Sequence, residues 1–212
     1  MKIRTVGDLD ARIDQDLVWR RKELTAFKAV ALRAGNKAEP VFARAGIAIV
    51  YAHWEGFVKT AGEFYVSYVR TQGLRRRELA SNFFALSIKK ELVATASTLN
   101  AAIYADVARC FTSGLDEAAR LPSAAVDTGS NLGVDTFHNI TILLGLDYSP
   151  YATKATPVIE KLLKLRNGVA HGEWNQVDIS LYERMHDEVI GMLGTFSDQL
   201  KIAASSSAYR VP

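Results

Sequence analysis

Cysteine and histidine are scarce in this chain of 212 residues. Cys110 is the only cysteine, which excludes an intramolecular disulfide and any metal site that needs several cysteines. Four histidines leave little material for a metal centre, and we expect neither a metal nor another cofactor. The longest apolar run, residues 45–52, is much too short to cross a bilayer as a helix.

Neither sign of charge dominates. The 26 basic and 23 acidic residues give a net charge of +3, which is compatible with a nucleic-acid partner but does not establish one. The first residues, MKIRTVGDLDARIDQD, carry charges where a signal peptide needs an apolar region. We therefore expect a cytoplasmic protein without a membrane segment.

Apolar residues recur at helical intervals along most of the chain. The clearest seam runs from Ile47 to Tyr68 and alternates intervals of four and three residues. A proline at the first helical position and a capping box mark the starts of the last two helices. The pattern predicts helices over residues 9–33, 41–71 and 134–144, a further helix from Thr156-Pro157, and a last helix from Ser180 to about Leu200.

The middle of the chain is less regular. Two helices are expected over residues 77–97 and 98–120, and a loop rich in Gly, Ser and Asn over 121–133. Strand-like alternation of apolar and polar residues is absent. The sequence therefore predicts one all-α domain over residues 1–212, a bundle of antiparallel helices with additional helices inserted in the middle. The segment 203–212 is expected to be a flexible tail.

One short motif carries chemistry, the string RNGVAHGEW that begins at Arg166. Arginine binds phosphate through a planar, permanently charged fork, and histidine exchanges a proton near neutral pH. Arg166 and His171 are five residues apart, which on a regular helix separates them by about 140°. The two glycines of this segment loosen the backbone, so that both side chains are able to reach one phosphate at the end of a helix.

The motif resembles the Arg-x4-6-His motif of the HEPN superfamily, including the polar residue, here Asn167, that often follows the arginine. The upstream strings YAHWEGFVK from Tyr51 and WRRKE from Trp19 resemble the MAE-like branch of that superfamily, as does the segment 130–146. The resemblance covers nearly the whole chain, from about residue 8 to residue 200.

This resemblance implies an all-α HEPN fold that forms a homodimer and brings two Arg–His motifs together. Many relatives are metal-independent endoribonucleases of toxin–antitoxin or anti-phage systems, so RNA and a cognate antitoxin are the implied partners. Arg166 would bind the phosphate, Asn167 would orient it, and His171 would act as general base or acid. The implied products carry a 2′,3′-cyclic phosphate and a 5′-hydroxyl. HEPN toxins controlled by adenylylation carry a tyrosine where this chain has Glu173, so that control is not expected.

Simpler interpretations remain open. Arg166 and His171 would also suit the negative end of a helix dipole, and the chain would then be a catalytically silent HEPN module that binds nucleic acid, nucleotide or a partner protein. The side chains of His53, Glu55 and Glu173 are candidates for polar support of the motif. Two basic runs are candidates for an RNA path, although such runs are more often solvated helix faces; they are Arg20, Arg21 and Lys22, and Arg75, Arg76 and Arg77.

Overall fold

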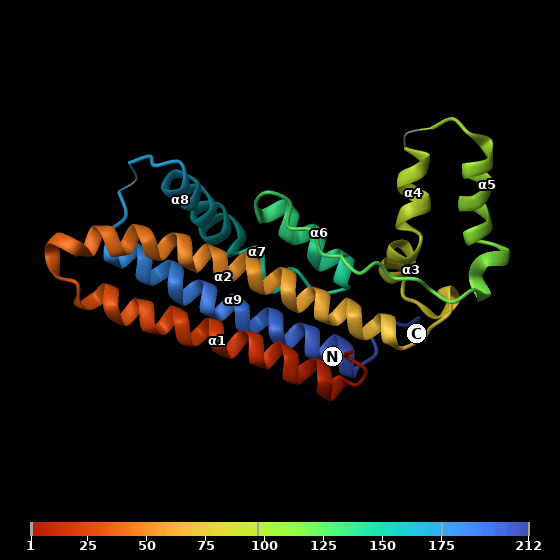
Figure 1. Ribbon diagram of the computed structural model, residues 1–212, viewed down its shortest axis with the longest axis horizontal. Coiled ribbons are helices and arrows are strands. Elements are labelled where there is room, and N and C mark those ends of the chain that lie inside the picture. The colour runs from red at the N-terminus through yellow and green to blue at the C-terminus, as the bar shows by residue number, and fades with distance from the viewer. Residues whose placement is uncertain (1, 97, 175, 212) are drawn as a thin grey trace.

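A computed structural model describes residues 2–96, 98–174 and 176–211, and its framework is three long helices that lie side by side (Figure 1). They are α1 (Val6–Arg33), α2 (Gly35–Thr71) and α9 (Ile179–Ser205). No strand occurs among the described residues, so the all-α fold is confirmed.

The three helices bury the apolar seams that the sequence predicts. The seam of α2 from Ile47 to Tyr68 is buried, as is the stripe of α9 from Tyr182 to Leu200. Gly46 permits close packing, because a Cβ at this position would clash with the Tyr182 ring. At the start of α1, Thr5 and Asp8 form a capping box that satisfies free N–H groups of the first turn.

A second layer covers α2 on the side away from α1. It contains α6 (Val134–Leu144) and α8 (Lys161–Ala170), and both helices contact α2. Phe137 of α6 joins the layers: its ring centroid lies 4.9 Å from that of Trp54 and 6.0 Å from that of Phe196. This packing fixes α8, and with it the RNGVAHGEW segment, against the middle of α2.

The connection between α2 and α6 is broken into short helices. Asn100 caps α5 by accepting a hydrogen bond from the Ala102 N–H, and the backbone breaks at Ile88 between α3 and α4. The expected helices over 77–97 and 98–120 are therefore shorter than predicted, whereas the loop over 121–133 is confirmed. The helix α4 and its neighbour α5 project from the body (Figure 1). The elements are η1 (Arg76–Glu78), α3 (Ser81–Ser87), α4 (Lys89–Thr95), α5 (Ala101–Cys110) and η2 (Ser113–Asp116).

Three predicted helix starts are wrong. Helix α2 begins at Gly35 and contains Pro40, whereas the prediction starts it at residue 41. Helical structure begins before Pro157, in the short α7 (Ser149–Ala152) and the π-helix η3 (Ala155–Glu160), which leads into α8. Proline lacks an N–H and cannot complete an α-helical hydrogen bond, which favours the wider turn. The last helix is capped by Asp178, whose carboxylate accepts a hydrogen bond from the Leu181 N–H, and not by Ser180.

The C-terminal segment differs from the expected flexible tail. Helix α9 continues to Ser205, and Tyr209 is only 3% exposed, with its ring 5.7 Å from that of Tyr68. The Tyr209 carbonyl accepts a hydrogen bond of 2.8 Å from the Ala80 N–H. One buried aromatic ring anchors the segment, and the polar composition around it gives no sign of this.

In the described part of the chain, no helix is long and apolar enough to span a membrane. Within the same residues, no three histidine, cysteine or acidic side chains gather closely enough to hold a metal ion.

Candidate functional site at the end of helix α8

Helix α8 ends in a Schellman motif, which positions His171. The Glu173 N–H donates to the Gly168 carbonyl at 2.8 Å, and the Gly172 N–H donates to the Val169 carbonyl at 3.2 Å. Gly172 has a positive φ of 71°, the left-handed conformation that this motif requires. His171 is the last residue before this turn, and its side chain is exposed to solvent.

Arg166 lies one turn earlier and points toward α2 and the 121–133 loop. Its Nη1 donates to the Oδ1 atoms of Asn131 at 2.8 Å and of Asn167 at 2.7 Å. Its Nη2 lies 3.8 Å from a Glu55 carboxylate oxygen. The guanidinium is thus held by acceptors from three parts of the chain, while 27% of the side chain stays exposed.

Tyr51 of α2 contacts the Arg166 guanidinium. Its ring lies under the guanidinium, with Arg166 Cζ 4.4 Å from the ring centroid, a cation–π contact. Its hydroxyl accepts a hydrogen bond of 2.6 Å from the Leu132 N–H, which ties the loop that carries Asn131 to α2. Burial raises the pKa of the Tyr51 hydroxyl to about 12, and the nearby Glu55 charge adds to this, so the group stays neutral at physiological pH.

Arg166 and His171 have different surroundings within one chain. His171 lines a surface hollow of about 370 Å³ on α8, and Arg166 is not among the residues that line it. Asn167 connects the two sides, because it lines the hollow and also accepts the hydrogen bond from Arg166. A single chain therefore presents the guanidinium beside Tyr51 of α2 and the imidazole at the hollow on α8.

Of the three residues expected to support the motif, Glu55 contacts Arg166. Glu173 lines the hollow beside His171. His53 instead faces α1: its Nε2 lies 3.3 Å from a Glu23 carboxylate oxygen, and its ring packs against Trp19. Residues two positions apart on a helix point about 160° away from each other, because each residue advances by about 100°. His53 and Glu55 therefore lie on different faces of α2.

His53 belongs to a separate buried cluster. Burial lowers the pKa of the His53 imidazole, and the Glu23 carboxylate opposes that change. Arg20, which is 7% exposed, fills the space over Gly56 and forms an ion pair of 2.7 Å with Asp16. This cluster joins α1 to α2 and contains no residue of the 166–173 motif.

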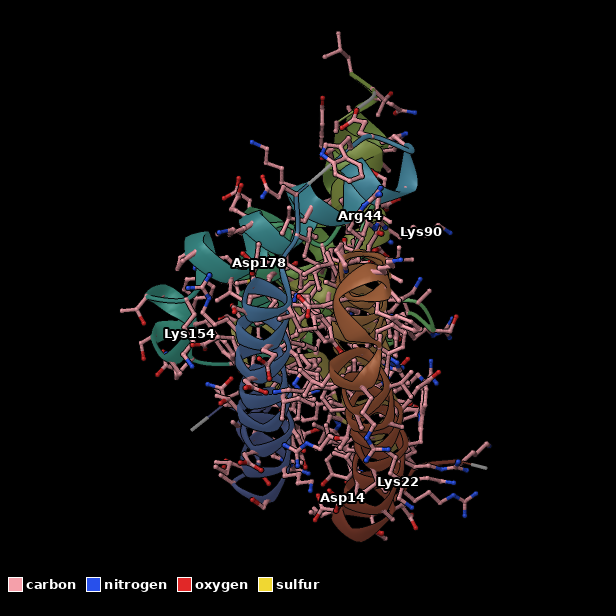
Figure 2. The ribbon with its side chains drawn as sticks, turned by 90° about the vertical axis from the view of Figure 1, so that its left-hand side faces the viewer. Asp14, Lys22, Arg44, Lys90, Lys154 and Asp178 are labelled. Atoms are coloured by element: carbon pink, nitrogen blue, oxygen red, sulfur yellow. The ribbon has the colours of Figure 1, made fainter. Side chains whose placement is uncertain are left out.

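The basic run of α1 divides into one buried and two exposed side chains. Arg20 is buried and paired with Asp16, so its side chain does not face solvent where RNA could bind. Arg21 is exposed and lies over Gly194 of α9. Lys22 is exposed as well, and Figure 2 places it on the opposite side of the molecule from Arg44 and α8.

The second basic run forms local ion pairs. Arg76 Nη1 lies 3.0 Å from a Glu117 carboxylate oxygen, and Arg77 Nη2 lies 2.5 Å from one of Asp116. Arg75 lies 3.5 Å from the other oxygen of Asp116. These pairs fasten η2 to η1 at the end of the molecule opposite α8 (Figure 1), so this run is separated from the motif.

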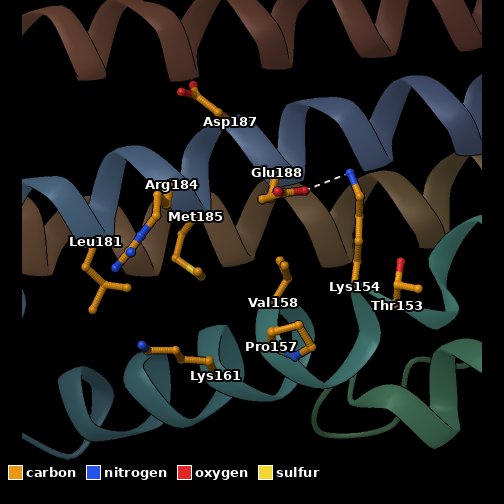
Figure 3. A pocket seen from close by; sticks show the side chains of 10 residues that line it. All are labelled: Thr153, Lys154, Pro157, Val158, Lys161, Leu181, Arg184, Met185, Asp187 and Glu188. Atoms are coloured by element: carbon orange, nitrogen blue, oxygen red, sulfur yellow. Dashed lines mark ion pairs between the residues drawn. The ribbon is translucent and has the colours of Figure 1, made fainter.

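A groove of about 710 Å³ lies between α9 and the η3–α8 segment (Figure 3). Met185 and Val158 form part of its floor, and Lys154 pairs across it with Glu188 at 2.8 Å. No residue that the sequence singles out as a site candidate lines this groove.

Sequence reasoning did not identify Tyr51 and Asn131 as contacts of Arg166. Tyr51 fits the buried apolar seam of α2, and Asn131 is one of several polar residues in a predicted loop. Both positions lie in strings that carry the HEPN resemblance, which is the one signal that marks them. Their contact with Arg166 depends on how distant segments pack.

Comparison with known protein families identifies the family of the chain. A family model described as HEPN_MAE_28990-like HEPN matches residues 9–209, a span that includes the motif from Arg166 and both upstream strings. No curated protein and no solved structure matches the chain.

Proposed function

The chain belongs to the MAE_28990-like HEPN family, and on this basis we propose that it is a metal-independent endoribonuclease that acts as a homodimer. The observation that carries the proposal is the end of α8. It presents the exposed imidazole of His171, and Asn167 joins this surface to the fixed guanidinium of Arg166.

A second copy of the chain completes the proposed site. Arg166 and His171 face adjoining surfaces within one chain, and a two-fold axis near the end of α8 would add a second pair from the same sequence. RNA bound across that axis would then meet two imidazoles and two guanidinium groups.

The proposed reaction uses the 2′-hydroxyl of the RNA as its nucleophile. One His171 takes the proton of that hydroxyl, whose oxygen attacks the adjacent phosphorus. The bond from phosphorus to the 5′-oxygen breaks, and the other His171 gives that oxygen a proton. Arg166 stabilises the negative charge on the phosphoryl oxygens. The products are a 2′,3′-cyclic phosphate and a 5′-hydroxyl, and DNA is not cleaved because it lacks the 2′-hydroxyl.

A second candidate function rests on the contacts of Arg166. Asn131, Asn167 and Glu55 already satisfy much of its guanidinium, which is what a structural arginine would show. On this alternative the chain is a catalytically silent HEPN module that binds nucleic acid, nucleotide or a protein partner. The two candidates differ in whether RNA is cut.

The decisive experiment is incubation of the purified protein with total RNA in EDTA, followed by mapping of the new RNA ends. We expect cleavage with cyclic-phosphate ends, and a loss of at least about 100-fold in rate for His171→Ala, the usual effect of removing a general acid or base. His138→Ala is the matched control, because His138 is also exposed but lies on α6 outside the motif. Unchanged cleavage by His171→Ala would refute the proposal, and intact RNA would favour the silent module.

The proposal includes a place in a toxin–antitoxin or anti-phage system, with a cognate antitoxin as a further partner. Expression of the wild-type chain in a bacterial host is then expected to arrest growth. His171→Ala and Arg166→Ala should relieve that arrest, whereas His138→Ala should not. Growth arrest that persists in both motif variants would mean that toxicity does not depend on RNA cleavage by this motif.

A further inference from the structure

Trp174 is unusually exposed for a residue of its type. Its exposed fraction is 81%, whereas Trp54 is fully buried and Trp19 is 45% exposed, with its Nε1 donating to Asp16 at 2.9 Å. An indole ring that faces water forgoes the stabilisation that burial would give. Because this ring lies outside the core and only three residues after His171, we infer that it contacts a ligand.

The backbone immediately before this ring is held by two hydrogen bonds. The N–H of the preceding residue, Glu173, donates to the Gly168 carbonyl, and its carbonyl accepts a hydrogen bond of 3.1 Å from Arg44 Nη2. The same guanidinium lies by the indole, with Arg44 Cζ 5.4 Å from the ring centroid. Arg44 comes from α2 and reaches the loop after α8 (Figure 2). Trp174 is thus an exposed ring with a cation beside it, presented by hydrogen-bonded backbone.

We propose that Trp174, backed by Arg44, is a stacking platform for one unpaired base of the RNA next to the scissile linkage; this inference rests on the proposed function. Three residues span at most about 11 Å, so the ring lies within reach of a nucleotide adjoining the phosphate at His171. Aromatic rings of this kind stack with any base, because every base has a π-face. Arg44 adds a positive charge that attracts the phosphate of the stacked nucleotide.

A stacking platform at Trp174 restricts the RNA structures that can bind there. A base within a duplex has both faces covered by its neighbours, so only a single-stranded segment, a loop or an end can offer a free face to Trp174. Discrimination between the four bases is expected to be weak, since stacking contacts do not involve the hydrogen-bonding edges.

The test measures binding without cleavage. A single-stranded 2′-O-methyl RNA oligonucleotide has no free 2′-hydroxyl, so its affinity for the full chain is separable from catalysis. We expect Trp174→Ala to bind it about tenfold more weakly than wild type, and Trp174→Phe to recover most of that loss. Trp19→Phe is the matched control and should bind as wild type does. Intrinsic fluorescence should be quenched by the oligonucleotide in wild type and much less in Trp174→Phe.

The other outcomes separate the platform from a contact between copies and from the proposed nuclease function. Wild-type affinity in Trp174→Ala, or an equal loss on a blunt duplex, would overturn it. A change in molecular mass without a change in RNA affinity would assign Trp174 to contact between copies instead. If the wild-type chain binds the oligonucleotide through Trp174 but never cuts RNA, the proposed nuclease function fails while the platform stands.

Discussion

At the scale of single residues, the fixed position of Arg166 is the central feature. Its Nη1 has two amide acceptors, Asn131 and Asn167, and the Tyr51 ring lies beneath its guanidinium. A long arginine side chain loses rotational freedom when it is fixed, and these contacts offset that cost. A guanidinium held before RNA arrives does not have to be ordered during the reaction.

Asn131→Ala tests this positioning. The variant removes one acceptor of Arg166 and leaves the motif itself intact, so we expect RNA cleavage to slow by about tenfold. The free energy of unfolding should fall by only about 1 kcal/mol, the usual value of one hydrogen bond. Cleavage kinetics and denaturant unfolding measure the two effects. Asn139→Ala, an exposed change on α6, is the control, and equal cleavage by both variants would argue against positioning by Asn131.

The motif residues could be identified from the sequence because they lie within six consecutive positions. Their supports could not, since Asn131 precedes Arg166 by 35 residues and Leu132 follows Tyr51 by 81. Arg20 shows the same limit. A basic side chain in a charged run is expected to be solvated, yet a glycine on the next helix gives it space to be buried against Asp16.

At the scale of elements, the turn at the end of α8 fixes the position of His171. The turn needs a left-handed residue at Gly172, and a side chain there meets no other atom within 4 Å. Any cost of substitution therefore comes from the backbone conformation alone. Long helices such as α2 and α9 could be predicted because their apolar seams are buried along their whole length. The short helices could not, because local caps such as Asn100 set their bounds.

Gly172→Ala should lower the free energy of unfolding by about 1 kcal/mol, because an L-residue is strained at positive φ. Gly191→Ala is the matched change on α9: it also meets no atom within 4 Å but has helical backbone, so it should raise stability by up to about 1 kcal/mol. Thermal or denaturant unfolding of both variants gives the comparison. Equal shifts in the same direction would contradict the assigned helix end. Gly172→Ala should also slow cleavage, since it disturbs the position of His171.

At the scale of the whole molecule, α8 and the projecting α4–α5 hairpin lie toward opposite ends of the three-helix framework (Figure 1). The chain therefore offers the motif at one end, free of the inserted helices. Within that end, Arg166 contacts Asn131, whereas His171 lines the hollow on α8. The proposed completion of the site by a second copy would make activity depend on protein concentration.

We expect the rate of RNA cleavage per chain to fall when the protein is diluted below its dimer dissociation constant, because dissociation separates the two motifs. The mass should fall over the same range from twice 23.3 kDa to 23.3 kDa. Mass photometry and initial cleavage rates on one dilution series provide the measurement. Ala170→Arg, which places a charge on the exposed end of α8, should shift both curves to higher concentration, whereas Arg77→Ala at the other end should shift neither. An undiminished rate per chain where only the 23.3 kDa species exists would mean that a single motif suffices.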